Sequence, residues 1–312
     1  FMFNIINLNK SYTSKLGYRT DILKDISFQL PNTGIVFILG KSGSGKTTLL
    51  NLLGGMDDFE RGDIQIYNNS FLNFKNNDYD NYRNSMVGFV FQDFNLISDL
   101  TVGQNIALSL ELQGTRTNPS LINEILTSVD LECFETRKIN ELSGSQQQRV
   151  AIARAFIKKT DVVFCDEPTG NLDSETTEVI FNFLKKMSQE KLIVVITHDK
   201  KNAFKFGDRV IEVKDGQIVA DLSRNAELQA TNKTNNKLKY DLKGQVLTEE
   251  MLKSISQKME SDSNSYQKFF IPTSGTPEKI ETIPLNNVKS HLSSLLALKM
   301  GTSLFKEKKY FY

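Results

Sequence analysis

The sequence has only two cysteines, Cys133 and Cys165, which lie far apart and match no metal-binding spacing. So few cysteines provide no disulfide framework and are typical of a reducing compartment. Because Cys165 lies in an apolar run, we expect a buried, unreactive thiol there. The chain also has no charge excess, since 38 basic residues are balanced by 37 acidic ones. Nucleic-acid-binding domains usually show a clear basic excess, so the balance argues against such a partner.

Long hydrophobic runs are also missing. No apolar run exceeds roughly six residues, against the roughly 20 that a helix needs to span a bilayer. The N-terminal residues show no signal-peptide pattern. Phe1 stands before Met2, so we expect the chain to be a piece of a longer protein. A length of 312 residues can hold one large domain or two small ones, with ample core.

A glycine-rich loop follows the apolar run 35–39 and precedes a helical pattern. It matches G-x-x-x-x-G-K-[ST], which in this strand–loop–helix context binds nucleotide phosphates. Glycines let the backbone N–H groups point inward at phosphate oxygens, and the helix N-terminus adds free donors. Lys46 supplies a charge for the β and γ phosphates, and Thr47 a hydroxyl for Mg²⁺. The residues concerned are Gly40, Lys41, Ser42, Gly43, Ser44, Gly45, Lys46, Thr47 and Thr48.

Two carboxylates, Asp166 and Glu167, end the predicted strand 161–166. Phosphoryl chemistry needs such a pair near a phosphate-binding loop: Asp166 can hold the metal, and Glu167 can orient and deprotonate the attacking water. Ligands of parallel sheets bind at the carboxyl ends of strands, where both residues are expected. A charged strand end is common by itself, but after such a loop the functional interpretation is favoured.

The segment 142–149, Leu-Ser-Gly-Ser-Gln-Gln-Gln-Arg, precedes another helical pattern. Ser143 and Gln146 have the spacing of a capping box, which could be their whole role. Alternatively, the helix N-terminus offers N–H groups and a hydroxyl to phosphate.

Strands and helices alternate around these motifs, which is typical of an α/β domain with a largely parallel sheet. A helical block at 101–157 interrupts the alternation and indicates an inserted subdomain. The stretch 68–82 is rich in Asn and Asp, so we expect loop with at most a short helix. The other expected strands and helices are 35–39, 48–53, 62–67, 86–91, 174–189, 192–197, 209–213 and 217–221.

The composition changes after about residue 223. Residues 223–290 are predicted to be a polar linker, partly disordered or marginally helical. In 291–312, leucines recur at helical spacing and are followed by lysines and aromatic residues. This pattern resembles a membrane-surface helix, but an amphipathic helix docked on the domain fits the periodicity equally well.

With these motifs in order, residues 2–222 resemble the ATP-binding cassette (ABC) ATPases. Gly40–Thr48 is similar to the Walker A loop, 142–146 to the signature motif and 162–167 to Walker B. Further matches are Tyr12 as the adenine-stacking aromatic, Gln92 as the Q-loop glutamine, Asn171-Leu-Asp173 as the D-loop and His198 as the switch histidine. The resemblance implies a P-loop NTPase fold with an antiparallel β subdomain, a mostly parallel core sheet and a helical subdomain at about 93–157.

The resemblance also implies a head-to-tail homodimer with two ATP molecules in its interface. Each ATP would lie between the Lys46 loop of one subunit and Ser143, Gly144 and Ser145 of the other. Thr47, Gln92 and Asp166 would hold Mg²⁺. Implied catalytic residues are Glu167, His198, Gln92 and Lys46, and Tyr12 and Asp173 would contribute to nucleotide binding.

The segments 88–96 and 166–173 resemble the branch that contains macrolide exporters, lipoprotein-release ATPases, cell-division ATPases and antimicrobial-peptide transporters. Some members are fused to a permease on their C-terminal side, and the basic segment 291–312 lies where the first membrane span would begin. We therefore expect a permease partner, fused or separate, and a location on the cytoplasmic face of the cell membrane. Motion would reach the permease through the surface near 92–97.

Two positions depart from the family pattern. Ser145 replaces the second glycine of the signature motif, where a Cβ could crowd the partner's γ-phosphate or a hydroxyl could add a donor. Lys41 is unusual within the Walker A loop of this branch. We expect activity to survive, because Glu167 is intact.

Two other functions fit the sequence less well. A soluble ABC ATPase acting on nucleic acid or ribosomes would need a long coiled coil between Gly40 and Leu142, or a second cassette, and the sequence has neither. A regulatory module without turnover is opposed by intact Glu167, Gln92 and His198.

Overall fold

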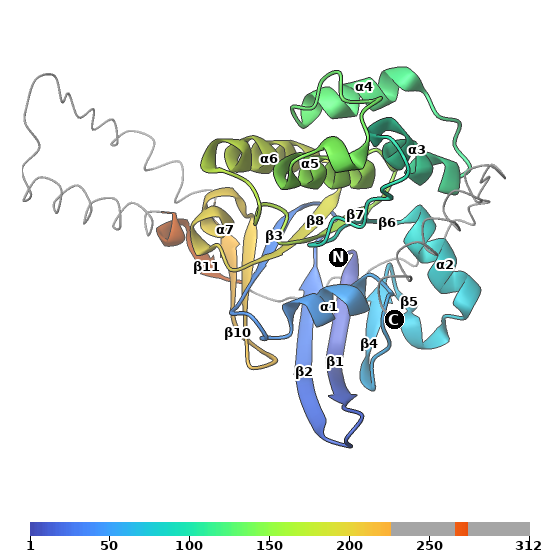
Figure 1. Cartoon of the computed structure of the whole chain (residues 1–312). Helices are drawn as coiled ribbons and strands as arrows, with labels where there is room; N and C mark the ends of the chain where they lie inside the picture. Colours follow the sequence, from blue (N-terminus) through green and yellow to red (C-terminus); the bar gives the residue numbers. More distant parts are fainter. Residues whose placement is uncertain (226–265, 274–312) are drawn as a thin grey trace, which may run out of the picture.

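The computed structural model describes residues 1–225 and 266–273. Within these ranges, two β-sheets and the helices stack in layers (Figure 1). The helices and strands are β1 (Phe3–Thr13), β2 (Arg19–Leu30), β3 (Gly34–Leu39), α1 (Lys46–Leu53), β4 (Arg61–Ile66), β5 (Asn69–Ser70), η1 (Phe71–Asn73), α2 (Asn76–Ser85), β6 (Val87–Val90), α3 (Val102–Leu112), α4 (Pro119–Ser128), η2 (Ile139–Glu141), α5 (Gly144–Phe156), β7 (Val162–Asp166), α6 (Ser174–Met187), β8 (Leu192–Thr197), α7 (Lys200–Phe206), β9 (Arg209–Lys214), β10 (Gln217–Arg224), η3 (Gln267–Phe269) and β11 (Phe270–Pro272).

The larger sheet has the strand order β11-β10-β9-β3-β8-β7-β6. The strands from β9 to β6 run parallel, and β10 and β11 add antiparallel pairs at one edge. Strands buried on both faces must be apolar throughout, which explains the continuous apolar runs in the sequence. In β3, Ile35 and Phe37 pack in the core beneath the helical layer, whereas Val36 and Ile38 pack in the core on the opposite face.

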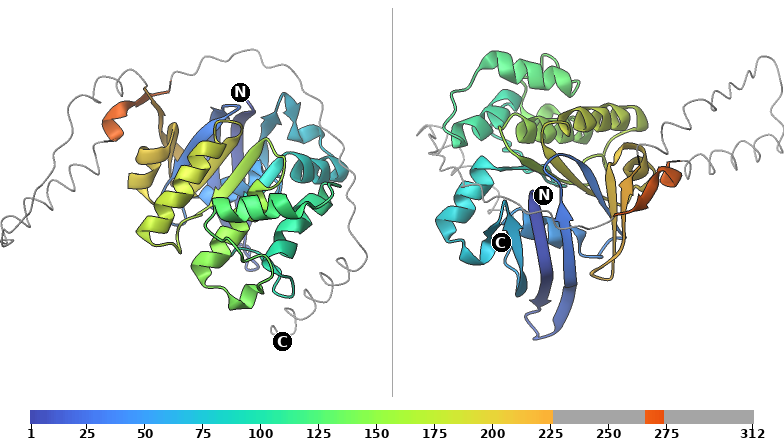
Figure 2. Two further views of the ribbon diagram at one scale, coloured as in Figure 1. Left: turned by 90° about the horizontal axis from the view of Figure 1, so that it is seen from above. Right: turned by 180° about the vertical axis from the view of Figure 1, so that it is seen from behind.

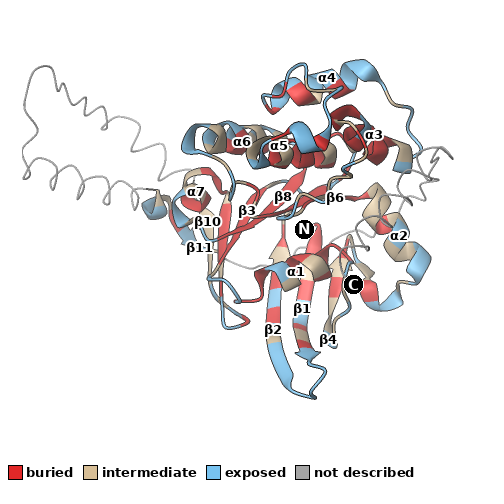
Figure 3. Ribbon diagram, viewed as in Figure 1, coloured by how far each residue is buried: buried red, intermediate tan, exposed pale blue. Residues whose placement is uncertain are grey.

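The smaller sheet is antiparallel, in the order β2-β1-β4-β5. Helix α1 lies between the two sheets, and its leucines fill the second core together with residues of both. The views from above and behind show α5 and α6 lying across the larger sheet, on the side away from the antiparallel sheet (Figure 2). Buried residues follow these two interfaces, and the tip of the β1–β2 hairpin is exposed (Figure 3).

The fold class expected from the sequence is confirmed: the core sheet is mostly parallel, an antiparallel sheet packs beside it, and helices α3, α4 and α5 form the predicted helical block. Each of these helices begins at a side-chain cap. Thr101, Asn118 and Ser143 accept hydrogen bonds from main-chain N–H groups of the first helical turn.

One local prediction was wrong. The stretch 68–82 is not mainly loop, because the ten-residue helix α2 begins within it at Asn76. The Asn-rich and Asp-rich composition lowers helix propensity, but aromatic packing overrides it. Tyr79 and Tyr82 of α2 lie edge-on to Phe71, at centroid distances of 5.6 and 5.2 Å. The short helix α7 was also missed.

The C-terminal part of the chain contributes one described segment, residues 266–273. It lies in the stretch predicted to be linker and forms η3 and β11, which pairs with β10. The rest of 226–290 and the amphipathic segment 291–312 lie outside the described residues. Across 1–225 and 266–273, the helices are too short or too polar for any of them to cross a bilayer.

The buried hydroxyl of Tyr82 gives a test of how α2 is attached. This hydroxyl donates a 2.6 Å hydrogen bond to the carbonyl of Leu53, at the end of α1. We expect Tyr82→Phe to lower the free energy of unfolding by about 1–2 kcal/mol, because the buried carbonyl loses its partner. The matched variant Tyr79→Phe removes a longer, part-buried bond to the carbonyl of Phe71 and should cost less. Urea unfolding measures both; equal costs would contradict this account.

Candidate nucleotide site

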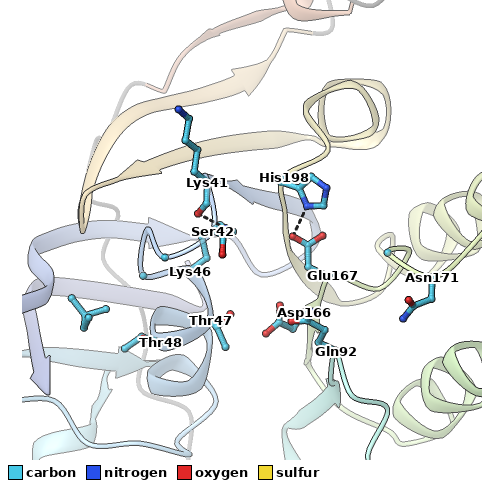
Figure 4. A pocket seen from close by; sticks show the side chains of 14 residues that line it. Lys41, Ser42, Lys46, Thr47, Thr48, Gln92, Asp166, Glu167, Asn171 and His198 are labelled. Atoms are coloured by element: carbon cyan, nitrogen blue, oxygen red, sulfur yellow. Dashed lines mark hydrogen bonds and ion pairs between the residues drawn. The ribbon is translucent and has the colours of Figure 1, made fainter. Parts of the chain in front are cut away.

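A cleft of about 720 Å³ opens at the carboxyl ends of the central strands (Figure 4). Its position is set by strand register, since Leu39 of β3 lies beside Thr197 of β8, and Ile196 lies beside Asp166 of β7. The residues just after these strands therefore meet at one edge of the sheet. The lining residues are Ile22, Lys41, Ser42, Gly43, Gly45, Lys46, Thr47, Thr48, Gln92, Asp166, Glu167, Gly170, Asn171 and His198.

The glycine-rich loop connects β3 to α1 and curls over its own lysine. The Lys46 Nζ atom donates to the carbonyl oxygens of Gly40 at 2.8 Å and Lys41 at 3.0 Å. Burial lowers the pKa of Lys46, and the nearby carboxylates of Glu167 and Asp166 oppose that shift. Gly45 adopts a left-handed φ of 96°, and a Cβ there would approach the carbonyl of Ile22 to 2.9 Å. Only glycine therefore fits this turn.

Asp166 is the last residue of β7 and is almost fully buried. Burial raises the pKa of its carboxyl group, and a hydrogen bond with the Thr47 side chain partly offsets that rise. The loop hydroxyl and the strand-end carboxylate are thus already in contact. Both are oxygen ligands of the kind that Mg²⁺ prefers.

Both carboxylate oxygens of Glu167 are held. The Thr197 hydroxyl donates to Oε2 at 2.9 Å, and His198 Nδ1 lies 2.9 Å from Oε1 (Figure 4). The backbone of Glu167 has a φ of 45°, which is uncommon for a residue with a side chain. Such left-handed positions cost about 1–3 kcal/mol and cluster at functional sites. Here the backbone turn directs the carboxylate into the cleft.

Gln92 lines the cleft at the start of the loop between β6 and α3. The partly buried Arg154 and the buried Asn105 hold this loop in place. Arg154 of α5 donates to the carbonyl oxygens of Phe94, at 2.7 Å, and Asn95. Burial lowers the pKa of Arg154 to about 10. Asn105 accepts a 2.8 Å bond from the N–H of Ile97 and donates to its carbonyl. The loop after Gln92 therefore has a defined conformation.

Some predicted site residues do not line this cleft. Ser143, Gly144 and Ser145 begin α5, where the Ser143 hydroxyl accepts a 3.2 Å bond from the N–H of Gln146 and caps the helix. Asp173 likewise caps α6 through the N–H groups of Glu175 and Thr176. The other predicted residues outside the lining are Tyr12, Gly40 and Ser44.

Tyr12 lies at the rim rather than in the cleft. Its hydroxyl donates to Asp57 Oδ2 at 2.5 Å and also hydrogen-bonds the side chain of Thr48, a lining residue. Tyr12 as a whole is 45% exposed, and the Lys10 amine lies over one side of its ring, 4.8 Å from the centroid. Burial, together with the smaller effect of the bond to Asp57, raises the pKa of Tyr12.

The sequence motifs did not assign Ile22, Gly170 and Asn171 to the site. They also gave no sign of the hydrogen bond from Thr197 to the Glu167 carboxylate. Asn171 could have been found, because it opens the D-loop motif. Ile22 had no signal, since it reaches the loop only through the path of β2 beneath Gly45.

A phosphate-binding loop facing a strand-end Asp-Glu pair on a parallel sheet defines a P-loop nucleotide hydrolase. A family model described as ABC transporter matches residues 23–170. The ABC transporter ATP-binding protein YxdL of Bacillus subtilis is 37% identical over 234 residues, which cover 73% of this chain and 89% of that protein. The chain belongs to the ABC transporter ATP-binding family and is an ATPase of that class.

Two further relatives refine the comparison. The macrolide export ATP-binding/permease protein MacB of Neisseria meningitidis is 36% identical over 229 residues, which cover 72% of this chain but only 35% of MacB. The dimeric cassette MJ0796 of Methanocaldococcus jannaschii, solved in a post-hydrolysis state with ADP and Pi, aligns with a TM-score of 0.67 at 36% identity. That alignment covers 70% of this chain and 97% of MJ0796.

The Arg154 contacts can be tested by hydrogen exchange. We expect Arg154→Met to accelerate exchange of the main-chain amides at 94–100 by at least roughly tenfold, because two carbonyl contacts to a charged donor are lost. Mass spectrometry of exchanged peptides measures this. The matched control is Arg116→Met, at an exposed position between α3 and α4. Unchanged exchange in Arg154→Met would show that Arg154 does not hold the loop.

Proposed function

We propose that this chain is the ATPase part of a membrane transporter, binding ATP with Mg²⁺ in the cleft and working as a head-to-tail homodimer. The observation that carries the proposal is the arrangement of Glu167. Its carboxylate faces the cleft that contains Lys46, and both of its oxygens are positioned, by Thr197 and His198. A carboxylate held in this way, near a phosphate-binding loop, suits the activation of water.

The loop has the features that a phosphate chain needs. Lys46 donates to carbonyl oxygens of its own loop, and phosphate oxygens would accept from the same ammonium group. The first N–H groups of α1 are free of helical partners and attract negative charge. A Cβ on Gly40 would lie 2.5 Å from the Val213 carbonyl oxygen, so no side chain fits at this position. These features support binding of the β and γ phosphates by 40–48.

Thr47, Asp166 and Gln92 would hold Mg²⁺, since each lines the cleft and carries a side-chain oxygen. Mg²⁺ would neutralise charge on the phosphates. The raised pKa of Asp166 fits this role, because its buried carboxylate lacks a full compensating charge in the chain alone.

For hydrolysis, Glu167 would accept the proton of the attacking water through a carboxylate oxygen. His198 would keep that carboxylate oriented and donate toward the leaving phosphate. Tyr12, which is exposed at the rim, would stack against adenine there. Each step uses a group whose place in the chain is fixed by a hydrogen bond or by the fold.

A second copy would complete the site. Ser143, Gly144 and Ser145 lie outside the lining of the cleft, yet a Cβ on Gly144 would meet nothing within 4 Å. The start of α5 is therefore an open surface that a phosphate on a second subunit could approach. The dimeric MJ0796 structures support this arrangement.

The partner would be a permease of the macrolide-exporter type, fused or separate. The names of MacB, an export ATP-binding/permease protein, and BceA, a bacitracin export ATP-binding protein, support this. The chain would then work on the cytoplasmic face of the membrane. The loop 92–97, fastened to α5, would be the surface that meets the permease, and 291–312 would lie next to the bilayer.

The base assignment predicts the behaviour of Glu167→Gln. We expect hydrolysis to slow by roughly 10²–10⁴, because the amide cannot accept the proton. ATP binding should persist, and dimers should accumulate. Phosphate release and size-exclusion chromatography with ATP measure these effects. Lys46→Ala provides the contrast, since it should lose nucleotide binding itself. Turnover at the parent rate in Glu167→Gln would refute the assignment.

Replacing Ser145 by the glycine of the family pattern should strengthen ATP-dependent dimerisation. We expect Ser145→Gly to favour ATP-dependent dimers by roughly two- to tenfold, because removing the Cβ relieves crowding worth up to about 1.4 kcal/mol. Ser145→Ala separates the Cβ from the hydroxyl and should behave like the parent chain. Sedimentation of the Glu167→Gln variant with each change measures dimerisation. Weaker dimers with glycine would mean that the serine hydroxyl contributes a bond.

A further inference from the structure

Residues 266–273 pack along the edge of β10 and against the adjoining end of α7. Residues 266–273 lie beyond the part of the chain that the family model matches, 23–170, and forty residues, 226–265, separate them from Asn225. We propose that this edge is a peptide-binding site for an aromatic-containing extended segment, and that 266–273 is its occupant within the same chain.

Main-chain bonds set the register of the segment. Asn225 N donates to the Phe269 carbonyl at 2.7 Å, and Thr273 N donates to the Asp221 carbonyl at 3.0 Å. In an antiparallel pair, only every second residue directs its main-chain N–H and C=O groups toward the partner strand. Phe269 and Thr273 do so here, and the nitrogen of Pro272 therefore points away from β10. Proline has no N–H to offer a further strand. The segment thus adds one strand by β-augmentation and closes the edge to another.

A pocket for one side chain supplies selectivity. The Phe270 ring is 9% exposed and lies edge-on to Phe204 of α7, with centroids 4.9 Å apart. The Arg224 guanidinium also lies over this ring, 4.9 Å from its centroid. The same guanidinium donates to the carbonyls of Phe204 and Gly207, at 2.6 and 2.7 Å, and so fastens the end of α7. Phe270 therefore packs against both a helix end and the arginine that holds it.

A polar contact fixes the far end. The Thr273 hydroxyl donates to Asp221 Oδ1 at 2.9 Å and lies 2.7 Å from the Ser223 hydroxyl. Asp221 also pairs with Arg209, which donates to the Gln29 carbonyl of β2 at 2.6 Å. The contacts of the Phe270 ring, the main-chain pairing with β10 and the contacts of the Thr273 hydroxyl make up the site. Between the two anchored side chains, Ile271 is 42% exposed and takes no part in the pocket.

The site shares a helix with the nucleotide cleft. Helix α7 starts after its N-cap, Asp199, which is the residue after His198. Its other end carries Phe204, against which Phe270 packs. Docking of the segment should therefore stabilise the helix next to the switch histidine. This inference stands whether or not the chain works with a permease.

The first test traps the docked state in the full chain. In a Cys133→Ser background, Ser223→Cys with Thr273→Cys should form an intrachain disulfide in most molecules under mild oxidation, because the replaced hydroxyls lie 2.7 Å apart. Peptide mapping by mass spectrometry detects the joined peptides. The control pair is Leu16→Cys with Thr273→Cys, since Leu16 lies on the exposed β1–β2 tip. No excess of joined peptide over this control would overturn the proposal.

The second test asks whether the site accepts the segment from solution. In the full chain, Phe270→Ala should speed amide exchange across α7 by about tenfold, whereas the matched variant Ile271→Ala should not. A synthetic peptide of residues 264–275 at about 1 mM, comparable to the effective concentration of a linked segment, should restore protection in Phe270→Ala. The same peptide with alanine for Phe270 should fail. Equal effects of the two variants, or no rescue by the parent peptide, would overturn the proposal.

Discussion

The site depends on the parallel register of three strands, because that register brings the segments that carry its charges to one edge of the sheet. With β8 between β3 and β7, Leu39 is level with Thr197, and Ile196 is level with Asp166. The glycine-rich loop, the two carboxylates and His198 thus emerge at one edge. A slip of one residue in a strand would turn every side chain to the other face. Both faces of these strands are buried in different cores, so the register is strongly specified.

Helix α5 connects two surfaces that the proposed dimer would need to coordinate. Its N-terminus carries Ser143 and Gly144, which the cleft of the same chain does not use. Near its C-terminus, Arg154 holds the carbonyls of Phe94 and Asn95, just after Gln92. Thirteen residues of helix span about 20 Å, so one rigid element joins the two. Under the proposed function, a displacement at the start of α5 would have a direct mechanical path to the loop after Gln92.

How much the sequence could predict depends on how local each signal is. The loop 40–48 and the pair Asp166-Glu167 are contiguous motifs beside apolar strands, so both the fold class and most of the lining were accessible. Helix α2 was mispredicted because Tyr79 and Tyr82 gain their stability from tertiary packing. Ile22 likewise reaches the cleft only through the packing of β2. Strand β11 escaped detection because three residues carry too little pattern, and residues 225–269 separate it from its partner β10.

The two edges of the core sheet are treated differently, one by a side chain and one by a short added strand. At the β6 edge, the Lys158 amine donates to the carbonyl oxygens of Val87, at 2.8 Å, and Arg83, at 3.1 Å. Burial lowers the pKa of Lys158 to about 8, which shows that desolvation disfavours its charged form. The hydrogen bonds to the Val87 and Arg83 carbonyls offset part of that cost. At the other edge, β11 covers β10. Of the residues that direct main-chain groups outward, Pro272 has no N–H, and the Phe270 N–H is bonded to the Gln267 carbonyl. If the chain dimerises through its cleft as proposed, sheet edges that recruit no further strand would leave that cleft as the main surface for a second copy. The segment 266–273 therefore does more than connect: it removes a competing surface and, through Phe270, steadies the helix beside the catalytic edge.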